Sequence, residues 1–152
     1  MPITSNIQIA APRDQVFGLF TDFASLAEHI EPITEIKMLT EGPVAVGTRF
    51  AETRIMFKKA ATEEMEVTQF EPNERYLLEA QSCGAHYLSE YQFTEKDDKT
   101  VVKMTFNARP VSLFAKLMTP LSFLMKGMLQ KCIDEDLQML KKVAETKKNQ
   151  ES

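Results

Sequence analysis

Alternating hydrophobic and polar positions dominate the first two thirds of the chain, and a helical pattern dominates the last third. Residues 3–10 alternate isoleucine with polar residues, which predicts a strand. Two short helical patterns follow at 12–20 and 23–30. Pro12 suits the first turn of a helix, and we expect the Asp22 side chain to cap the second helix by accepting hydrogen bonds from the amides that follow it.

Six further segments are predicted as strands because they alternate or are bounded by turn residues. They are residues 33–39, 48–57, 61–70, 75–82, 86–95 and 100–108. Tight turns join the last five of them, which predicts an antiparallel meander. A sheet of seven antiparallel strands twists and therefore curls.

The rest of the chain predicts one long amphipathic helix over 111–147, with apolar residues every three or four positions. Pro120 should kink this helix or split it near Met118. Residues 148–152 are predicted to be a frayed polar tail, and residues 1–147 a single domain. We therefore expect an α+β fold in which the long helix packs its apolar stripe on the concave face of the curled sheet.

The strand at 48–57 has two possible orientations. If Phe50 and Met56 point inward, Glu52 and Arg54 do too, and buried charges must be paired. If the orientation is reversed, the inward residues are Ala51, Thr53, Ile55 and Phe57, and both charges are solvated. We favour the solvated alternative. The acidic residues Glu63, Glu64 and Glu66 are likewise expected on a solvated outer face.

Composition and charge narrow the function classes. The chain has 152 residues and a formal net charge of -4, which argues against nucleic acid as a partner. No uninterrupted apolar segment is long enough to span a membrane, and no signal peptide is visible. The two cysteines, Cys83 and Cys132, are interpreted as reduced, and we expect a cytoplasmic protein.

Several segments together resemble the START-like, pollen-allergen-type helix-grip (SRPBCC) superfamily, and within it the polyketide cyclase/dehydrase and lipid-transport-like proteins. The segments are "IAAPRDQVFGLFTDF", "VGTRF", "EVTQFEPNERYLLEA", "YQFTEKDDKTVVKMTF" and the final helix ending "DLQMLKKVAE". The resemblance implies a helix-grip fold: a seven-stranded curved antiparallel sheet wrapped around the C-terminal helix, with two short helices between strands 1 and 2. It also implies an apolar cavity that holds a lipid, a polyketide or an aromatic-like molecule.

The sequence offers large and flexible side chains for the walls of such a cavity. Tyr87, Ser89 and Tyr91 are expected to orient a polar end of the ligand. The candidate lining residues are Phe50, Met65, Val67, Tyr76, Leu78, Tyr87, Ser89, Tyr91, Phe93, Met104, Phe106, Phe114, Leu117, Met118, Leu121 and Met125. The competing interpretation is that these side chains simply fill the interior.

Catalytic chemistry is weakly indicated. The two histidines, His29 and His86, lack the accompanying ligands of a metal site, so we expect no metal and no cofactor. His29 suits the C-terminal turn of its helix, and His86 should face solvent beside Glu90. The leading hypothesis is a binding or transport protein for an apolar small molecule. The alternatives are a cyclase/dehydrase-type enzyme that uses Tyr87, Tyr91 or the Glu52/Arg54 pair, and a regulatory module whose methionine-rich helix at 117–129 meets a partner or forms a homodimer.

Overall fold

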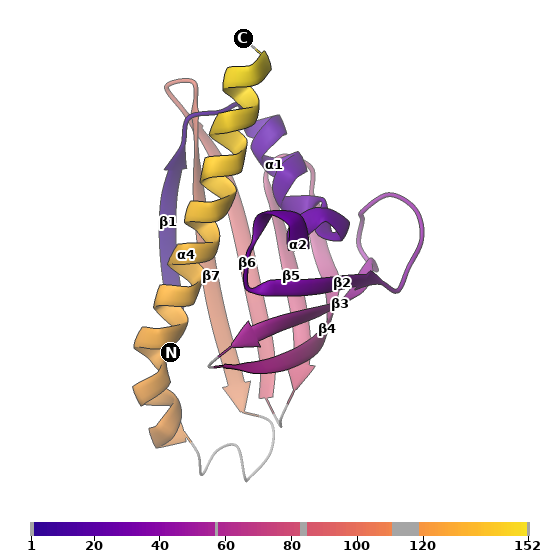
Figure 1. The fold of residues 1–152 in the computed structure, drawn as a ribbon, viewed down its shortest axis with the longest axis vertical. Coiled ribbons are helices and arrows are strands. Elements are labelled where there is room, and N and C mark those ends of the chain that lie inside the picture. The colour runs from indigo at the N-terminus through magenta and orange to yellow at the C-terminus, as the bar shows by residue number, and fades with distance from the viewer. Residues whose placement is uncertain (1, 57, 83–84, 111–118, 152) are drawn as a thin grey trace.

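The computed structural model describes residues 2–56, 58–82, 85–110 and 119–151. For residues 56, 82, 110, 119–125 and 150–151 it describes the backbone alone. Within these ranges one curved sheet faces one long helix, and two short helices close the upper end of the space between them (Figure 1).

The elements follow one another in the order that the hydrophobic pattern predicts. They are β1 (Ile3–Ile9), α1 (Arg13–Thr21), the short 3-10 helix η1 (Phe23–Ser25), α2 (Leu26–His29), β2 (Ile33–Met38), β3 (Arg49–Met56), β4 (Lys59–Glu71), β5 (Arg75–Ser82), β6 (Ala85–Lys96), β7 (Lys99–Pro110) and α4 (Thr119–Glu151). The seven strands are antiparallel in the order β1-β7-β6-β5-β4-β3-β2. The helix-grip fold is therefore confirmed.

The strand register places one set of side chains on the inner, concave face of the sheet. Phe50 pairs with Met65, and Val67 pairs with Leu78. Tyr76 pairs with Tyr91, which in turn pairs with Met104 on β7. Because directly paired residues point to the same face, these alternating positions form one continuous inner surface.

The helices between β1 and β2 fill the upper half of this surface. Phe17 and Phe20 of α1 contact Phe93 edge-on, at ring-centroid distances of 5.1 and 5.3 Å. Phe23 of η1 stacks on Phe50 at 4.5 Å. These aromatic contacts bury the stripe that the sequence predicted for the two short helices, and they make this end of the interior a solid core.

The predicted role of Asp22 is wrong in its detail. Its side chain makes no capping hydrogen bond; instead its backbone carbonyl accepts a hydrogen bond from the amide of Ser25 at 3.1 Å. Asp22 also donates its own amide to the carbonyl of Gly18. The second helical segment therefore starts as a 3-10 turn that is capped by a backbone carbonyl and not by a side chain.

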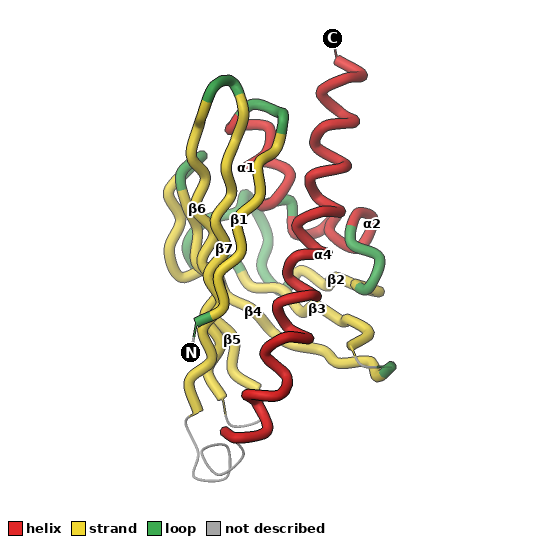
Figure 2. Tube along the Cα trace, turned by 90° about the vertical axis from the view of Figure 1, so that its left-hand side faces the viewer, coloured by secondary structure: helices red, strands yellow, loops and turns green. Residues whose placement is uncertain are grey.

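Helix α4 lies along β1 and crosses the concave side of the sheet (Figure 2). Leu137, Leu140 and Ala144 supply its buried stripe. On the β1 side, Asp134 accepts a hydrogen bond from Ser5, and Glu145 accepts one from the amide of Ala10 at 2.8 Å.

The limits of α4 differ from the predicted 111–147. Pro120 is the second residue of the helix, where its missing amide hydrogen costs nothing, and residues 111–118 lie outside the described residues. The helix continues to Glu151, past the predicted end at Lys147.

Candidate functional site

Strand β3 turns its charged residues inward, so the favoured solvated orientation is wrong. Phe50 is fully buried on the inner face, and Glu52 and Arg54 follow it at alternating positions. Ile55, which that orientation placed inside, is 45% exposed. The stacking of Phe50 on Phe23 fixes the orientation of the whole strand, because successive side chains point to opposite faces.

Arg54 stands at the centre of a partly buried ion cluster that joins the sheet to α4. Its guanidinium lies 2.8 Å from the carboxylate of Asp136 on α4 and 3.6 Å from that of Glu52. Only 15% of the Arg54 side chain is exposed, against 12% for Glu52 and 22% for Asp136. The pair at 2.8 Å is a charge-assisted hydrogen bond that crosses the interior from strand to helix.

A third carboxyl group belongs to the same cluster. Glu63 on β4 is directly opposite Glu52 in the register, so it faces inward and not, as predicted, outward with Glu64 and Glu66. Those two do face outward, where both pair with Arg49. Glu52, Glu63 and Asp136 thus surround one guanidinium. We call these four residues the Arg54 cluster.

Burial changes the proton affinities of the three carboxyl groups. Loss of solvent raises the pKa of Glu52, Glu63 and Asp136, and the positive charge of Arg54 opposes that rise in each case. For Glu52, the neighbouring charges of Asp136 and Glu63 raise the pKa further. The cluster therefore contains more negative charge than its one cation neutralises.

Two stacked tyrosines lie beside the cluster. The rings of Tyr76 and Tyr91 are 4.8 Å apart and nearly parallel, at 14°. Burial raises the pKa of Tyr91, and the charges of Asp136 and Glu52 raise it further, so the phenol stays protonated. Tyr76 is buried and Tyr91 is partly buried, and neither hydroxyl is hydrogen-bonded to a described residue.

The predicted lining residues fall into three groups. Six are buried and pack into the core: Phe50, Val67, Tyr76, Leu78, Phe93 and Met104. Five are only partly buried: Met65, Tyr87, Ser89, Tyr91 and Phe106. Of these, Tyr91 still contacts Phe20 of α1, with ring centroids 6.1 Å apart. Phe114, Leu117 and Met118 lie outside the described residues, and for Leu121 and Met125 only the helical backbone is described. Contact of these residues with a ligand stays a prediction.

His86 lies on the outer face of the sheet together with Glu90, as predicted. Its Nε2 lies 2.8 Å from Glu79 on the neighbouring strand, while Glu90 binds Arg75. His29 is half-buried and ends α2. Among the described residues, no group of three or more His, Cys, Asp or Glu side chains could hold a metal ion.

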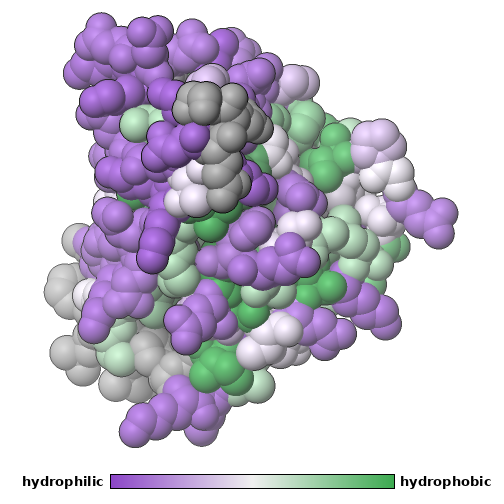
Figure 3. All heavy atoms as spheres, turned by 45° about the horizontal axis from the view of Figure 1, so that its top comes forward, coloured by the Kyte–Doolittle hydropathy of each residue, from purple (hydrophilic) through white to green (hydrophobic). Residues whose placement is uncertain are grey.

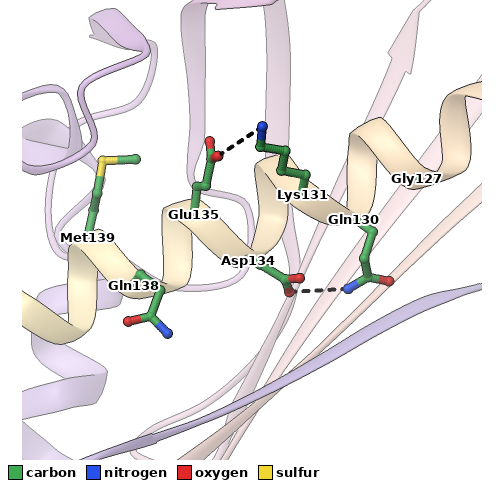
Figure 4. Close-up of a pocket in the computed structure, with 7 residues that line it drawn as sticks. All are labelled: Gly127, Gln130, Lys131, Asp134, Glu135, Gln138 and Met139. Atoms are coloured by element: carbon green, nitrogen blue, oxygen red, sulfur yellow. Dashed lines mark hydrogen bonds and ion pairs between the residues drawn. The ribbon is translucent and has the colours of Figure 1, made fainter.

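An open groove of about 530 Å³ runs along α4, but it lies on the solvent side of the helix. In Figure 4, Gln130 points toward Asp134 and Lys131 toward Glu135. The groove is lined by Gly127, Gln130, Lys131, Asp134, Glu135, Gln138 and Met139. These residues recur every three or four positions and share one side of α4, whereas the buried Leu137 and Leu140 lie on another side.

Few large hydrophobic side chains are exposed in the part of the chain whose side chains are described. The face in Figure 3 is mostly hydrophilic, with hydrophobic side chains in patches between hydrophilic ones. Among the described large hydrophobic residues, the exposed ones are Leu39, Val46, Ile55 and Met128. Of the helix predicted to meet a partner, 117–129, only the last four residues have described side chains, and Met128 is half exposed.

Asp136 and Glu63 were missed by the reasoning from sequence. Asp136 carried a readable signal, because it stands three residues after Ile133 and four before Leu140, on the edge of the apolar stripe. Glu63 carried a signal too, because it stands two residues before Met65, which was predicted to face inward, and strand residues two apart share a face.

The chain resembles known proteins over nearly its whole length. Residues 2–145 match the family described as polyketide cyclase / dehydrase and lipid transport. Among solved structures, the Zhui aromatase/cyclase from a Streptomyces species superposes with a TM-score of 0.76 at 14% identity, covering 95% of this chain and 93% of that one. A START superfamily protein from Mycobacterium smegmatis superposes with a TM-score of 0.69 at 13% identity, covering 99% of each chain. No curated protein matches the sequence. Among the described residues, no helix is long and apolar enough to cross a membrane.

Proposed function

Because the chain belongs to the polyketide cyclase/dehydrase and lipid transport family, we propose that it binds an apolar small molecule between the sheet and α4. The observation that supports this proposal is the contrast between the two halves of the inner face. Aromatic residues of α1 and η1 fill the upper half and reach as far as Tyr91, whereas the lower half carries the partly buried Met65, Tyr87, Ser89 and Phe106.

The lower half has the mixture that small-molecule sites need. Its walls are aromatic and thioether side chains, and its few polar groups are concentrated at Ser89, the tyrosine hydroxyls and the Arg54 cluster. An apolar ligand would gain about 25 cal/mol per Å² of surface removed from water. The polar groups at one end would fix its orientation. A cytoplasmic location and a homodimer stay predictions.

The test uses a bulky side chain placed on either face of the same strand. Ser89 faces inward and is half-buried, and its neighbour Leu88 faces outward and is also half-buried. We expect Ser89→Trp to weaken binding of the neutral fluorophore Nile red by about tenfold or more, because the indole occupies the space of the ligand. Leu88→Trp should leave binding unchanged.

The chain contains no tryptophan, so the introduced indole also reports on its surroundings by its own fluorescence. Circular dichroism establishes that both variants fold. Absence of Nile red binding to the unaltered protein, or equal loss in both variants, would contradict the proposed site.

A second candidate function, a cyclase/dehydrase-type enzyme, is favoured by one observation: charged groups do lie beside a tyrosine. The charges of Glu52, Arg54 and Asp136 all influence Tyr91. In a dehydration, the Glu52 carboxylate would remove the proton α to a ketone and Tyr91 would protonate the departing hydroxyl, so that a carbon–carbon double bond and water form.

A simple β-hydroxy ketone, 4-hydroxy-4-phenylbutan-2-one, tests this chemistry through the absorbance of the enone product. Glu52→Gln should lower the rate by about 10²-fold or more, since positioned acid–base groups contribute that much. Turnover no faster than in buffer, or equal turnover by Glu52→Gln, argues for binding alone.

A further inference from the structure

The polar groups on the inner face differ in charge from those that a carrier of fatty acids needs. A carboxylate ligand requires a cation or several amide hydrogens without another partner. In the Arg54 cluster, the only cation already lies 2.8 Å from Asp136 and 3.6 Å from Glu52. An incoming anion would have to displace one of these carboxylates.

The net charge of the Arg54 cluster also disfavours an anionic ligand. Arg54 and Asp136 form an ion pair, so they cancel. Glu52 and Glu63 remain, opposite each other on β3 and β4. When they are protonated the cluster is neutral, and when they are ionised it carries up to two negative charges. In neither state does it present a net positive charge to a ligand.

A second observation, independent of the carboxyl groups, indicates that this end of the interior receives a polar partner. Tyr76 is 2% exposed, yet its hydroxyl has no hydrogen bond to any described residue. Its ring stacks on that of Tyr91, whose pKa is shifted by the charges of Asp136, Glu52 and Arg54. Buried hydroxyl groups are nearly always hydrogen-bonded, so a ligand group or water is expected here.

We infer, on the basis of the proposed binding function, that the ligand has a neutral or cationic polar end that donates hydrogen bonds, such as a hydroxyl or an amine, and that carboxylic acids are selected against. Glu52 and Glu63 accept these hydrogen bonds, and the tyrosine hydroxyls lie on the same side. A carboxylate end meets like charge in a site of low polarity, and such a juxtaposition is costly.

The test compares three probes with the same alkyl chain and different ends: 1-dodecanol, dodecylamine and dodecanoic acid. Each displaces Nile red at pH 7, below the concentration at which it forms micelles. We expect the acid to bind about tenfold or more weakly than the alcohol and the amine. Acid binding as tight as that of the alcohol overturns the inference and leaves the proposed function standing. Failure of the alcohol to bind overturns the proposed function and the inference with it.

Two neighbouring glutamates supply a matched pair of variants. Glu63 faces the interior and Glu64 faces outward toward Arg49, so the same change alters the net charge equally on opposite faces. Glu63→Gln should reduce the ratio between the affinities for dodecylamine and dodecanoic acid by about threefold or more, and Glu64→Gln should leave that ratio unchanged. Equal effects of the two variants would overturn the assignment to the Arg54 cluster.

Discussion

Removal of the Arg54 charge should destabilise the protein far more than removal of an outward arginine on the same strand. In Arg54→Met the apolar stem is retained and the guanidinium is lost. Asp136 and Glu52 then keep their burial without the cation that lies 2.8 and 3.6 Å from them. Removing one partner of a buried pair leaves the remaining charges buried without a counterion, which lowers the free energy of unfolding.

The structure sets the size of the effect. At an effective dielectric constant of about 20, the two separations correspond to attractions of about 6 and about 5 kcal/mol. Desolvation of the three groups offsets most of this, and the net loss on removing one partner of a buried pair is about 3–5 kcal/mol. For a chain of this length that loss lowers the melting temperature by roughly 10 °C.

The loss should depend on pH with a definite sign. Burial raises the pKa of Glu52, Glu63 and Asp136, so the folded state binds their protons more tightly than the unfolded chain does. Stability from these groups is fully present below their ordinary pKa values, about 4, and is lost as the pH rises through the raised values. Without Arg54 the pKa values rise further, so Arg54→Met should lose less stability at pH 5 than at pH 7.

Urea denaturation followed by circular dichroism measures these differences. Arg49→Met is the control, because Arg49 also pairs at 2.9 Å with a glutamate but is 48% exposed, and an exposed pair contributes at most about 1 kcal/mol. A loss below about 1 kcal/mol for Arg54→Met, or equal losses for both variants at both pH values, refutes the reasoning. The neutral combination Arg54→Met/Glu52→Gln/Asp136→Asn should recover most of the stability.

Three further changes test other parts of the structure. Glu52→Gln mimics the protonated carboxyl group, so it should raise the free energy of unfolding at pH 7 and flatten its fall between pH 4 and pH 7, which a urea series at several pH values measures. Phe20→Ala in the filled upper half should lower the free energy of unfolding by about 3–5 kcal/mol. Phe106→Ala at the partly buried lower half should lower it by less than about 2 kcal/mol and should weaken Nile red binding. Equal losses of stability would contradict the division of the inner face. Gly47→Ala should cost about 1–3 kcal/mol by thermal melting, because Gly47 has a φ of 96° that a side chain strains, although nothing lies near the added Cβ; an unchanged melting temperature would contradict this.

Much of the candidate site depends on residues whose side-chain directions local pattern does not settle. Phe93 and Met104 alternate cleanly with polar residues, and their inward direction was predictable. Strand β3 alternates imperfectly, since it carries apolar residues at both parities, and here the preferred orientation was wrong. Contact with Phe23 of η1, distant in sequence, decides that Phe50 points inward, and Glu52 and Arg54 follow.

Hydrophobic periodicity and turn residues were enough to determine the seven strands, the two short helices, the long helix and their order, because these are local properties of the chain. The aromatic residues of α1 and η1 decided which half of the inner face is filled, and only the folded chain brings them there. Tertiary structure alone likewise placed Asp136 of α4 against Arg54 of β3, and Glu63 opposite Glu52. The physical reason is that the two members of the Arg54–Asp136 pair are 82 positions apart, so no periodicity in the sequence connects them. Whether either charge is buried depends on how the strand and the helix pack together.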